Sequence, residues 1–197
     1  MVGPIVLRTP LSADDVRGLK AGDVVSISGV IVTGRDKVHA YLVEKMPGRD
    51  ELPVDLAGAI LYHCGPVMKE TDGVFTAVAA GPTTSMRMEM YEPRVISGFG
   101  IRGIMGKGGM GSHTLQALRE NGGVYFNAVG GAAVYLADRI ARVIGVWKLE
   151  EFGPAEALWI LEVKDFPAVV TMDSHGNDMH REIEQRSLGR FRELLGK

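Results

Sequence analysis

Residues 24–46, VVSISGVIVTGRDKVHAYLVEKM, change their periodicity within one short segment. Residues 24–32 are rich in β-branched side chains and partly alternate with polar ones, which predicts a strand. Residues 35–46 carry apolar side chains at helical spacing and end before a Pro-Gly pair, which predicts a helix. Arg35 and Asp36 therefore stand at a strand-to-helix turn, where functional side chains are often found.

The rest of the chain also mixes apolar strands with amphipathic helices, and we find no internal repeat. A capping box at Ser12 predicts a short first helix that ends near Gly22. We predict strands over 57–63 and 74–80, both buried, and over 124–129, 143–149, 158–163 and 168–172, helices over 113–121, 132–143 and 178–195, and an aperiodic glycine-rich loop over 94–111.

These elements predict the fold class. Strands and helices do not alternate strictly, so we expect an α/β domain with a mixed sheet flanked by helices. A chain of 197 residues can form one sizeable core, which predicts a single domain over residues 1–197. The charged segment over about 178–195 is expected to be a surface helix of that domain.

Composition argues against several classes of function. The 22 Lys and Arg and 24 Asp and Glu leave a net charge of −2, so the chain lacks the positive field that binds nucleic acid. It has no apolar run of about 18 residues and no signal-peptide pattern, which predicts a cytoplasmic protein without a membrane span. The one cysteine, Cys64, allows no internal disulfide and cannot supply the several thiolates of an iron–sulfur cluster.

Two glycine-rich segments carry polar side chains that a core cannot use, GPTTSMR at residues 81–87 and GKGGMG at residues 106–111. The first places Thr83, Thr84 and Arg87 on a connection constrained by proline. One interpretation is that a threonine caps a helix while the arginine makes a surface ion pair. The other is that Arg35, Arg87 and Lys107 surround a small molecule with more than one carboxylate, because guanidinium groups bind carboxylates through two hydrogen bonds.

The second segment contains the pattern G-x-G-x-x-G at Gly106, Gly108 and Gly111. A dinucleotide site also needs a clean preceding strand and an acid about 20 residues later, and both are missing. A P-loop is excluded because Gly108 stands where a serine or threonine should follow the lysine. Two interpretations remain, an anion site formed by backbone N–H groups with Lys107, and a mobile surface loop.

Other polar residues are weaker candidates. His39 follows Arg35 on the same helix face, where it could orient a site group or be structural. Cys64 is expected to be a small buried hydrophobe. His175 and His180 lie in or beside DSHGND, residues 173–178, which resembles a metal motif but is rich in turn formers, so we predict a plain turn and no metal site.

Taken in order, five segments resemble the β subunit of class I, iron–sulfur fumarate hydratases and the related L-tartrate dehydratases. They are TGRDKVH (33–39), YHCGP (62–66), GPTTSMRM (81–88), IMGKGGM (104–110) and EVKDFPAVVTMDSHGND (162–178). The resemblance implies a swivelling β/β/α fold. It also implies that an α subunit holds a [4Fe-4S] cluster through three cysteines, with one iron open to bind the substrate hydroxyl.

The same resemblance implies roles for site residues. Thr83 matches the proposed base of the family, while Arg35, Arg87 and Lys107 match residues that hold the carboxylates, and Thr84 is assigned to substrate binding. The expected function is reversible hydration of fumarate to (S)-malate by a β subunit, in an α2β2-type hetero-oligomer, or as a homodimer when isolated. L-tartrate dehydratase is the alternative, and a non-catalytic dicarboxylate-binding module is a third.

Overall fold

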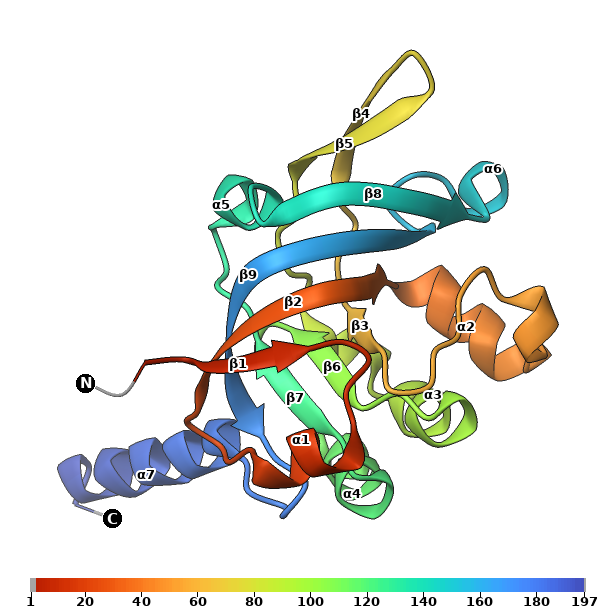
Figure 1. Ribbon diagram of the computed structural model, residues 1–197. Coiled ribbons are helices and arrows are strands. Elements are labelled where there is room, and N and C mark those ends of the chain that lie inside the picture. The colour runs from red at the N-terminus through yellow and green to blue at the C-terminus, as the bar shows by residue number, and fades with distance from the viewer. Residues whose placement is uncertain (1–2, 197) are drawn as a thin grey trace.

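The computed structural model describes residues 3–196 as a mixed sheet with helices packed on it and one projecting hairpin (Figure 1). The elements in chain order are β1 (Ile5–Arg8), α1 (Ala13–Gly18), β2 (Val24–Thr33), α2 (Asp36–Lys45), η1 (Arg49–Glu51), β3 (Ile60–Tyr62), β4 (Val67–Thr71), β5 (Val74–Ala79), η2 (Ser85–Met88), α3 (Glu92–Phe99), β6 (Gly103–Gly106), α4 (Ser112–Asn121), β7 (Val124–Asn127), α5 (Ala133–Ala137), β8 (Ile140–Trp147), α6 (Leu149–Phe152), β9 (Leu158–Met172) and α7 (Met179–Leu194).

The main sheet has seven strands in the order β1-β2-β3-β6-β7-β9-β8. Neighbours from β1 to β7 are parallel, and β9 runs antiparallel to β7, β8 and β2. Because β9 pairs with β2 as well as with β7, strands β2, β3, β6, β7 and β9 close into a ring. The prediction of a mixed sheet flanked by helices is confirmed.

The two faces of the central strands fill two different cores. Along β3, Ile60 and Tyr62 belong to the first core, while Leu61 between them belongs to the second, as expected for side chains that alternate across a sheet. The second core also contains the apolar faces of α2, α3 and α4. These helices therefore cover the outer face of the parallel strands.

Several predicted elements are wrong in instructive ways. The segment over 94–111 is not one loop, because it contains most of α3 and the strand β6, in which Gly103 allows close packing against Ile60 and Phe126. The helix predicted over 132–143 is only the short α5, and β8 begins at Ile140. The two strands predicted after residue 158 are one long strand, β9. The segment over 74–80 is not buried, because β5 pairs only with β4 in a hairpin whose side chains are alternately exposed.

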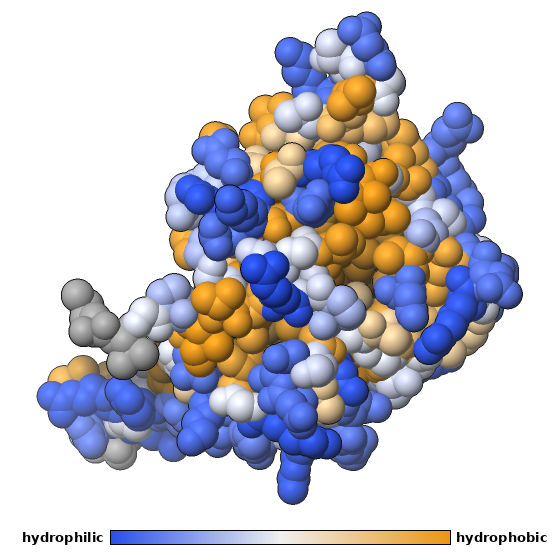
Figure 2. All heavy atoms as spheres, in the orientation of Figure 1, coloured by the Kyte–Doolittle hydropathy of each residue, from blue (hydrophilic) through white to orange (hydrophobic). Residues whose placement is uncertain are grey.

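The C-terminal helix agrees with its prediction. Helix α7 starts after Asp178, whose carboxylate accepts hydrogen bonds from the N–H groups of His180 and Arg181, and none of its residues is buried. It extends away from the sheet in Figure 1, and its surface is largely hydrophilic in Figure 2, whereas apolar residues gather over β2, β8 and β9. Among the described residues, no helix combines the length and the apolar character that a membrane crossing requires.

Candidate functional site

The predicted site residues lie on connections that leave one edge of the sheet. Strands β2, β3 and β6 are parallel neighbours, so their carboxyl ends meet at the same edge. Arg35 follows the end of β2, and Lys107 follows the end of β6. This edge is where ligands bind in open sheets of parallel strands.

Backbone hydrogen bonds attach the threonine segment to this edge. The N–H of Thr83 donates to the carbonyl oxygen of His63 at 2.7 Å, and the N–H of Lys107 donates to the carbonyl oxygen of Thr83 at 3.3 Å. Thr84 and Lys107 form a parallel bridge, and the N–H of Ser85 returns to the Lys107 carbonyl oxygen at 3.1 Å. The structure therefore places Thr83 and Thr84 directly beside Lys107. The helix-cap interpretation is wrong for Thr84, whose side chain makes no capping bond to η2.

The two arginines join the same region through acidic partners. A guanidinium nitrogen of Arg87 forms a short ion pair with Asp36, the residue after Arg35. The Nε atom of Arg35 lies 3.2 Å from Glu156 Oε1, without hydrogen-bond alignment. The Arg35 guanidinium also lies against Gly65, two residues beyond His63, so Arg35 contacts the connection that anchors Thr83.

The glycine-rich loop binds an anion that the chain itself supplies. The carboxylate of Glu89 accepts hydrogen bonds from the backbone N–H groups of Gly111, His113 and Thr114 and from the Thr114 hydroxyl, at 2.6 to 3.2 Å. The expectation of unpaired N–H groups for a ligand at this helix start is therefore wrong. Lys107 remains available, because no ion pair within residues 3–196 involves its side chain.

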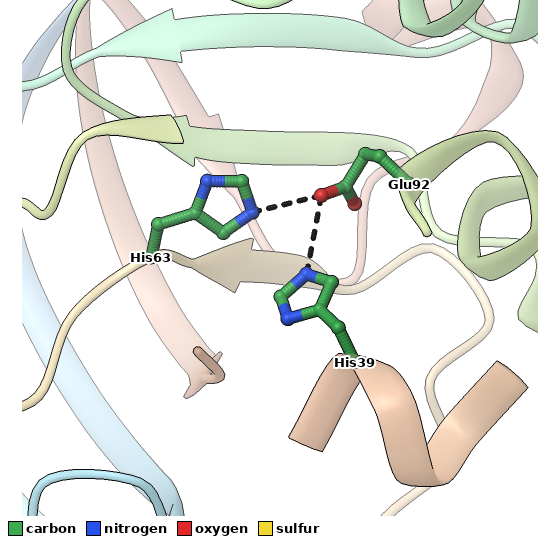
Figure 3. A group of neighbouring side chains, drawn as sticks. All are labelled: His39, His63 and Glu92. Carbon is green, nitrogen blue, oxygen red and sulfur yellow. Dashed lines mark hydrogen bonds and ion pairs between the residues drawn. The ribbon is translucent and has the colours of Figure 1, made fainter. Parts of the chain in front are cut away.

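Behind this edge lies a fully buried group of His39, His63 and Glu92 (Figure 3). The Nε2 atoms of His39 and His63 lie 3.1 Å and 2.9 Å from the same Glu92 oxygen, Oε2. The Nδ1 atom of His39 lies 2.7 Å from the carbonyl oxygen of Arg35. His39 therefore has a polar role in the core, directly behind a predicted site residue.

The group continues toward the glycine-rich loop. Ser85 Oγ lies 2.8 Å from His63 Nδ1 and 2.8 Å from the hydroxyl of Tyr125. Ser85, His63 and Glu92 have the connectivity of a serine–histidine–acid triad, but the Ser85 hydroxyl is buried and cannot reach a substrate. The arrangement is therefore a structural network, because the Ser85 hydroxyl has no access to solvent.

Charge is distributed unevenly in this network. Burial lowers the pKa of both imidazoles, but at His39 the adjacent Glu92 outweighs burial and the pKa is raised, whereas at His63 burial prevails and the pKa is lowered. Burial alone would raise the pKa of the Glu92 carboxyl, but the two imidazoles lower it to about 2. Glu92 is therefore ionised at neutral pH, and His39 is the imidazole of the pair that takes up a proton more readily.

The weaker candidates have structural roles. Cys64 is buried, and burial raises the pKa of its thiol to about 12. The DSHGND segment is a turn, as predicted, in which the Asp173 carboxylate accepts hydrogen bonds from Ala21, His175 and Asn177. His180 packs over Gly109 and lies 3.0 Å from the Thr171 hydroxyl. His175 and His180 are therefore not joined in one site.

Sequence reasoning missed most of the buried network. Glu92 lies at the start of α3, just before the segment over 94–111 that is predicted as a loop, and Ser85 and Tyr125 belong to segments far apart in the sequence. His39 carried a local signal through its helical spacing from Arg35, and His63 directly follows the apolar strand β3, whose end faces the other candidates. A polar residue in that position is a candidate, but its partners depend on the tertiary fold.

Comparisons with known proteins show similarities over most of this chain. Residues 2–183 match the family described as fumarase C-terminus. A putative class I fumarate hydratase of Geobacillus stearothermophilus is 57% identical over 185 residues, which are 93% of this chain but only 35% of that protein. A putative L(+)-tartrate dehydratase subunit beta of Methanocaldococcus jannaschii is 42% identical over 94% of this chain and 96% of its own length. The L(+)-tartrate dehydratase subunit beta of Escherichia coli is 37% identical over 88% of this chain and 85% of its own length.

Proposed function

This chain belongs to the fumarase C-terminus family, and we propose that it is the β subunit of a hydro-lyase that reversibly hydrates fumarate to (S)-malate at an interface with an α subunit. The observation that carries the proposal is the grouping of Thr83, Lys107, Arg35 and Arg87 around one edge of the sheet. The relatives named subunit beta support a separate partner subunit. This chain matches 96% of the length of the one from Methanocaldococcus jannaschii.

The three cations suit a molecule with two carboxylates. We assign Arg35, Arg87 and Lys107 to the carboxylates and Thr84 to a polar contact beside them. Arg87 pairs with Asp36, so a substrate carboxylate would share or replace that partner. Guanidinium groups fixed in advance stabilise the charge that develops on a carboxylate as the neighbouring carbon loses its proton.

Thr83 is the proposed base that removes this proton. A threonine hydroxyl is a weak base at neutral pH, so its alkoxide must be stabilised by a neighbour. Lys107 is the neighbour that the structure offers, since its backbone is hydrogen-bonded to that of Thr83. In this assignment the ammonium group serves both the substrate and the base.

This chain does not fit the requirements of a cluster ligand set. It contains one cysteine, and that thiol is buried with its pKa raised. We assign the [4Fe-4S] cluster to the α subunit, and the roles given above to residues of this chain do not depend on its geometry. The proposal also includes an α2β2-type assembly and a cytoplasmic location.

L-tartrate dehydratase is the second candidate. The specific observation in its favour is that the two relatives of similar length to this chain carry that name, whereas the fumarate hydratase relative is much longer. Both reactions need cations for two carboxylates and a base beside them. The substrates of the two reactions differ in their hydroxyl groups, and the residues at this edge suit both of them.

Co-expression with a cluster-bearing α chain tests the proposal. Under anaerobic conditions the complex should act on fumarate or L-tartrate, and neither chain should do so alone. A Thr83→Ala variant should lose at least about 100-fold in kcat. Thr76→Ala, on the exposed strand β5, is the matched control and should keep full activity. Dicarboxylate binding without turnover in a cluster-loaded complex would favour the binding-module alternative and contradict ours.

A further inference from the structure

The hydrogen bonds of the buried network determine where its protons are. A carbonyl oxygen only accepts, so the 2.7 Å contact with Arg35 places a proton on His39 Nδ1. The Nε2 atom of His39 then faces an ionised Glu92 at 3.1 Å. A bare nitrogen lone pair would be repelled by the carboxylate, so Nε2 carries a proton as well and His39 is an imidazolium.

The remaining contacts are satisfied with a neutral His63, which its lowered pKa favours over a second imidazolium. His63 Nε2–H donates to Glu92, which leaves His63 Nδ1 to accept from the Ser85 hydroxyl. Ser85 Oγ in turn accepts from the Tyr125 hydroxyl. In this assignment Tyr125 donates to Ser85, Ser85 to His63 and His63 to Glu92. His39 donates to Glu92 and to the carbonyl oxygen of Arg35.

The network touches each segment that carries a proposed site residue. His39 holds the carbonyl of Arg35. His63 holds Thr83, because its own carbonyl oxygen accepts from the Thr83 N–H. Ser85 donates its N–H to the carbonyl oxygen of Lys107, so its fixed position also fixes that residue. Three connections from three strand ends are thus tied to one carboxylate.

We propose that Glu92, with His39 and His63, is a positioning residue of the site, which holds the Arg35, Thr83 and Lys107 segments in register through a buried imidazolium–carboxylate–imidazole unit. This inference rests on the proposed function. None of the three side chains touches substrate, because all are fully buried.

The energetics favour positioning over stabilisation as the role of this unit. A buried ion pair is often no more stabilising than apolar residues of the same volume. Here the second oxygen of Glu92, Oε1, has no hydrogen-bond partner among the described residues, which adds a desolvation cost. The raised pKa of His39 and the lowered pKa of Glu92 agree with the protons assigned above, and Asp36 on α2 adds to the effect at His39.

A metal ion is the competing interpretation, since two histidines and a glutamate form a known ligand set. Ligand atoms around a tetrahedral zinc ion are about 3.4 Å apart. The two nitrogens lie 3.1 Å and 2.9 Å from the carboxylate oxygen, which are hydrogen-bond distances. The geometry therefore points to protons between these atoms.

NMR of the ¹⁵N-histidine-labelled full chain tests the proton assignment without reference to activity. At pH 7.5 both ring nitrogens of His39 should carry a proton, and only Nε2 of His63 should. In Glu92→Gln, His39 should keep its Nδ1 proton and lose the other. A bare nitrogen on His39 in the wild-type chain, or stoichiometric zinc in the purified protein, would overturn the inference.

Kinetics of the complex with the α subunit test the positioning role. Glu92→Leu removes the hydrogen bonds and should raise KM for the dicarboxylate at least about tenfold. In Glu92→Gln the amide oxygen can accept from His63 Nε2–H while the amide N–H donates to the bare Nε2 of His39, so both contacts are kept and KM should stay within about threefold. Asp173→Asn is the control for losing a buried carboxylate elsewhere, with a lower melting temperature but an unchanged KM.

The outcomes separate the two proposals. A folded Glu92→Leu complex with wild-type KM, or a Glu92→Gln complex as impaired as Glu92→Leu, contradicts positioning and leaves the proposed function intact. If Glu92→Leu does not fold, the wild-type NMR result and Glu92→Gln still decide. A wild-type complex inactive on both substrates contradicts the proposed function, while the proton assignment is judged by NMR alone.

Discussion

At the scale of single residues, the glycines of the GKGGMG segment make room for the protein's own side chains. A side chain on Gly106 would collide with the Ser85 hydroxyl, and one on Gly111 would collide with the Glu89 carboxylate. Gly108 has a φ of +82°, which other residues rarely adopt. The packing and backbone conformation of this chain thus require all three glycines of the dinucleotide-like pattern. This explains why the pattern occurs without the preceding strand and the later acid of a dinucleotide site.

Replacing Gly106 by alanine tests whether this glycine makes room for the Ser85 hydroxyl. The added methyl group should displace Ser85 and break its hydrogen bonds to His63 and Tyr125, at a cost of about 1–3 kcal/mol in the free energy of unfolding. Gly145→Ala is a matched control, because its Cβ would meet Ile160 only at an ordinary 3.8 Å. Urea unfolding measures both, and equal stability of the two variants would show that Ser85 is free to move.

At the scale of elements, the sequence predicted those whose pattern is local. The strand-to-helix unit of β2 and α2 was found because its periodicity changes at Thr33-Gly34, and α7 because its apolar and charged residues repeat at helical spacing. Strand β6 was missed because its glycines are required by contacts with distant residues, which no local pattern reveals. The same reason hid Glu92. Arg35 follows the end of a strand as the sequence predicted, and the roles of the five proposed site residues stay predictions.

The connection between α6 and β9 supplies a support for Arg35. Glu156 lies 3.2 Å from Arg35 Nε through one oxygen and accepts from the Lys37 N–H at 3.0 Å through the other. Glu156→Gln should raise KM for the dicarboxylate several-fold and destabilise the chain by about 1–3 kcal/mol, because both side chains are largely buried. Glu151→Gln, which removes a surface pair with Lys148, is the control in the same kinetic assay. An unchanged KM in Glu156→Gln would exclude this support.

The turn between β9 and α7 gives a dependence on pH. Burial would raise the pKa of Asp173, but hydrogen bonds from Asn177, Ala21 and His175 lower it below the ordinary 3.8. The carboxylate therefore stabilises the fold above pH 3.8, and this contribution is lost as the pH falls below that value. Asp173→Asn should destabilise the chain by about 1–3 kcal/mol at pH 7.

Urea unfolding at pH 7 and pH 3 checks this sign. The difference between wild type and Asp173→Asn should shrink at the lower pH, because the wild-type carboxyl approaches its protonated form. Asp14→Asn, on an exposed side chain of α1, should differ from wild type by little at either pH. A difference that grows on acidification would contradict the lowered pKa.

At the scale of the whole molecule, the site lies open on one edge of the ring of strands. The Arg87 side chain is 50% exposed and its partner Asp36 is 37% exposed, so this chain alone does not exclude water from the cations. Catalysis by preorganised charges needs a site from which water is excluded. The openness of the edge therefore supports the proposal that a second subunit completes the site.

Helix α7 should be dispensable for folding beyond its first turns. At its start His180 contacts Thr171 and Gly109 of the body and the preceding Asp178 pairs with Met172, and no residue of the helix is buried. A chain that ends at Glu184 should melt within about 2 °C of the full chain, because few apolar contacts are lost. A chain that ends at Ser174 loses the cover of Gly109 and the Asp173 turn, and it should melt several degrees lower, by circular dichroism. Equal loss in both would mean that the distal turns, with exposed Phe191 and Leu194, stabilise the isolated chain after all.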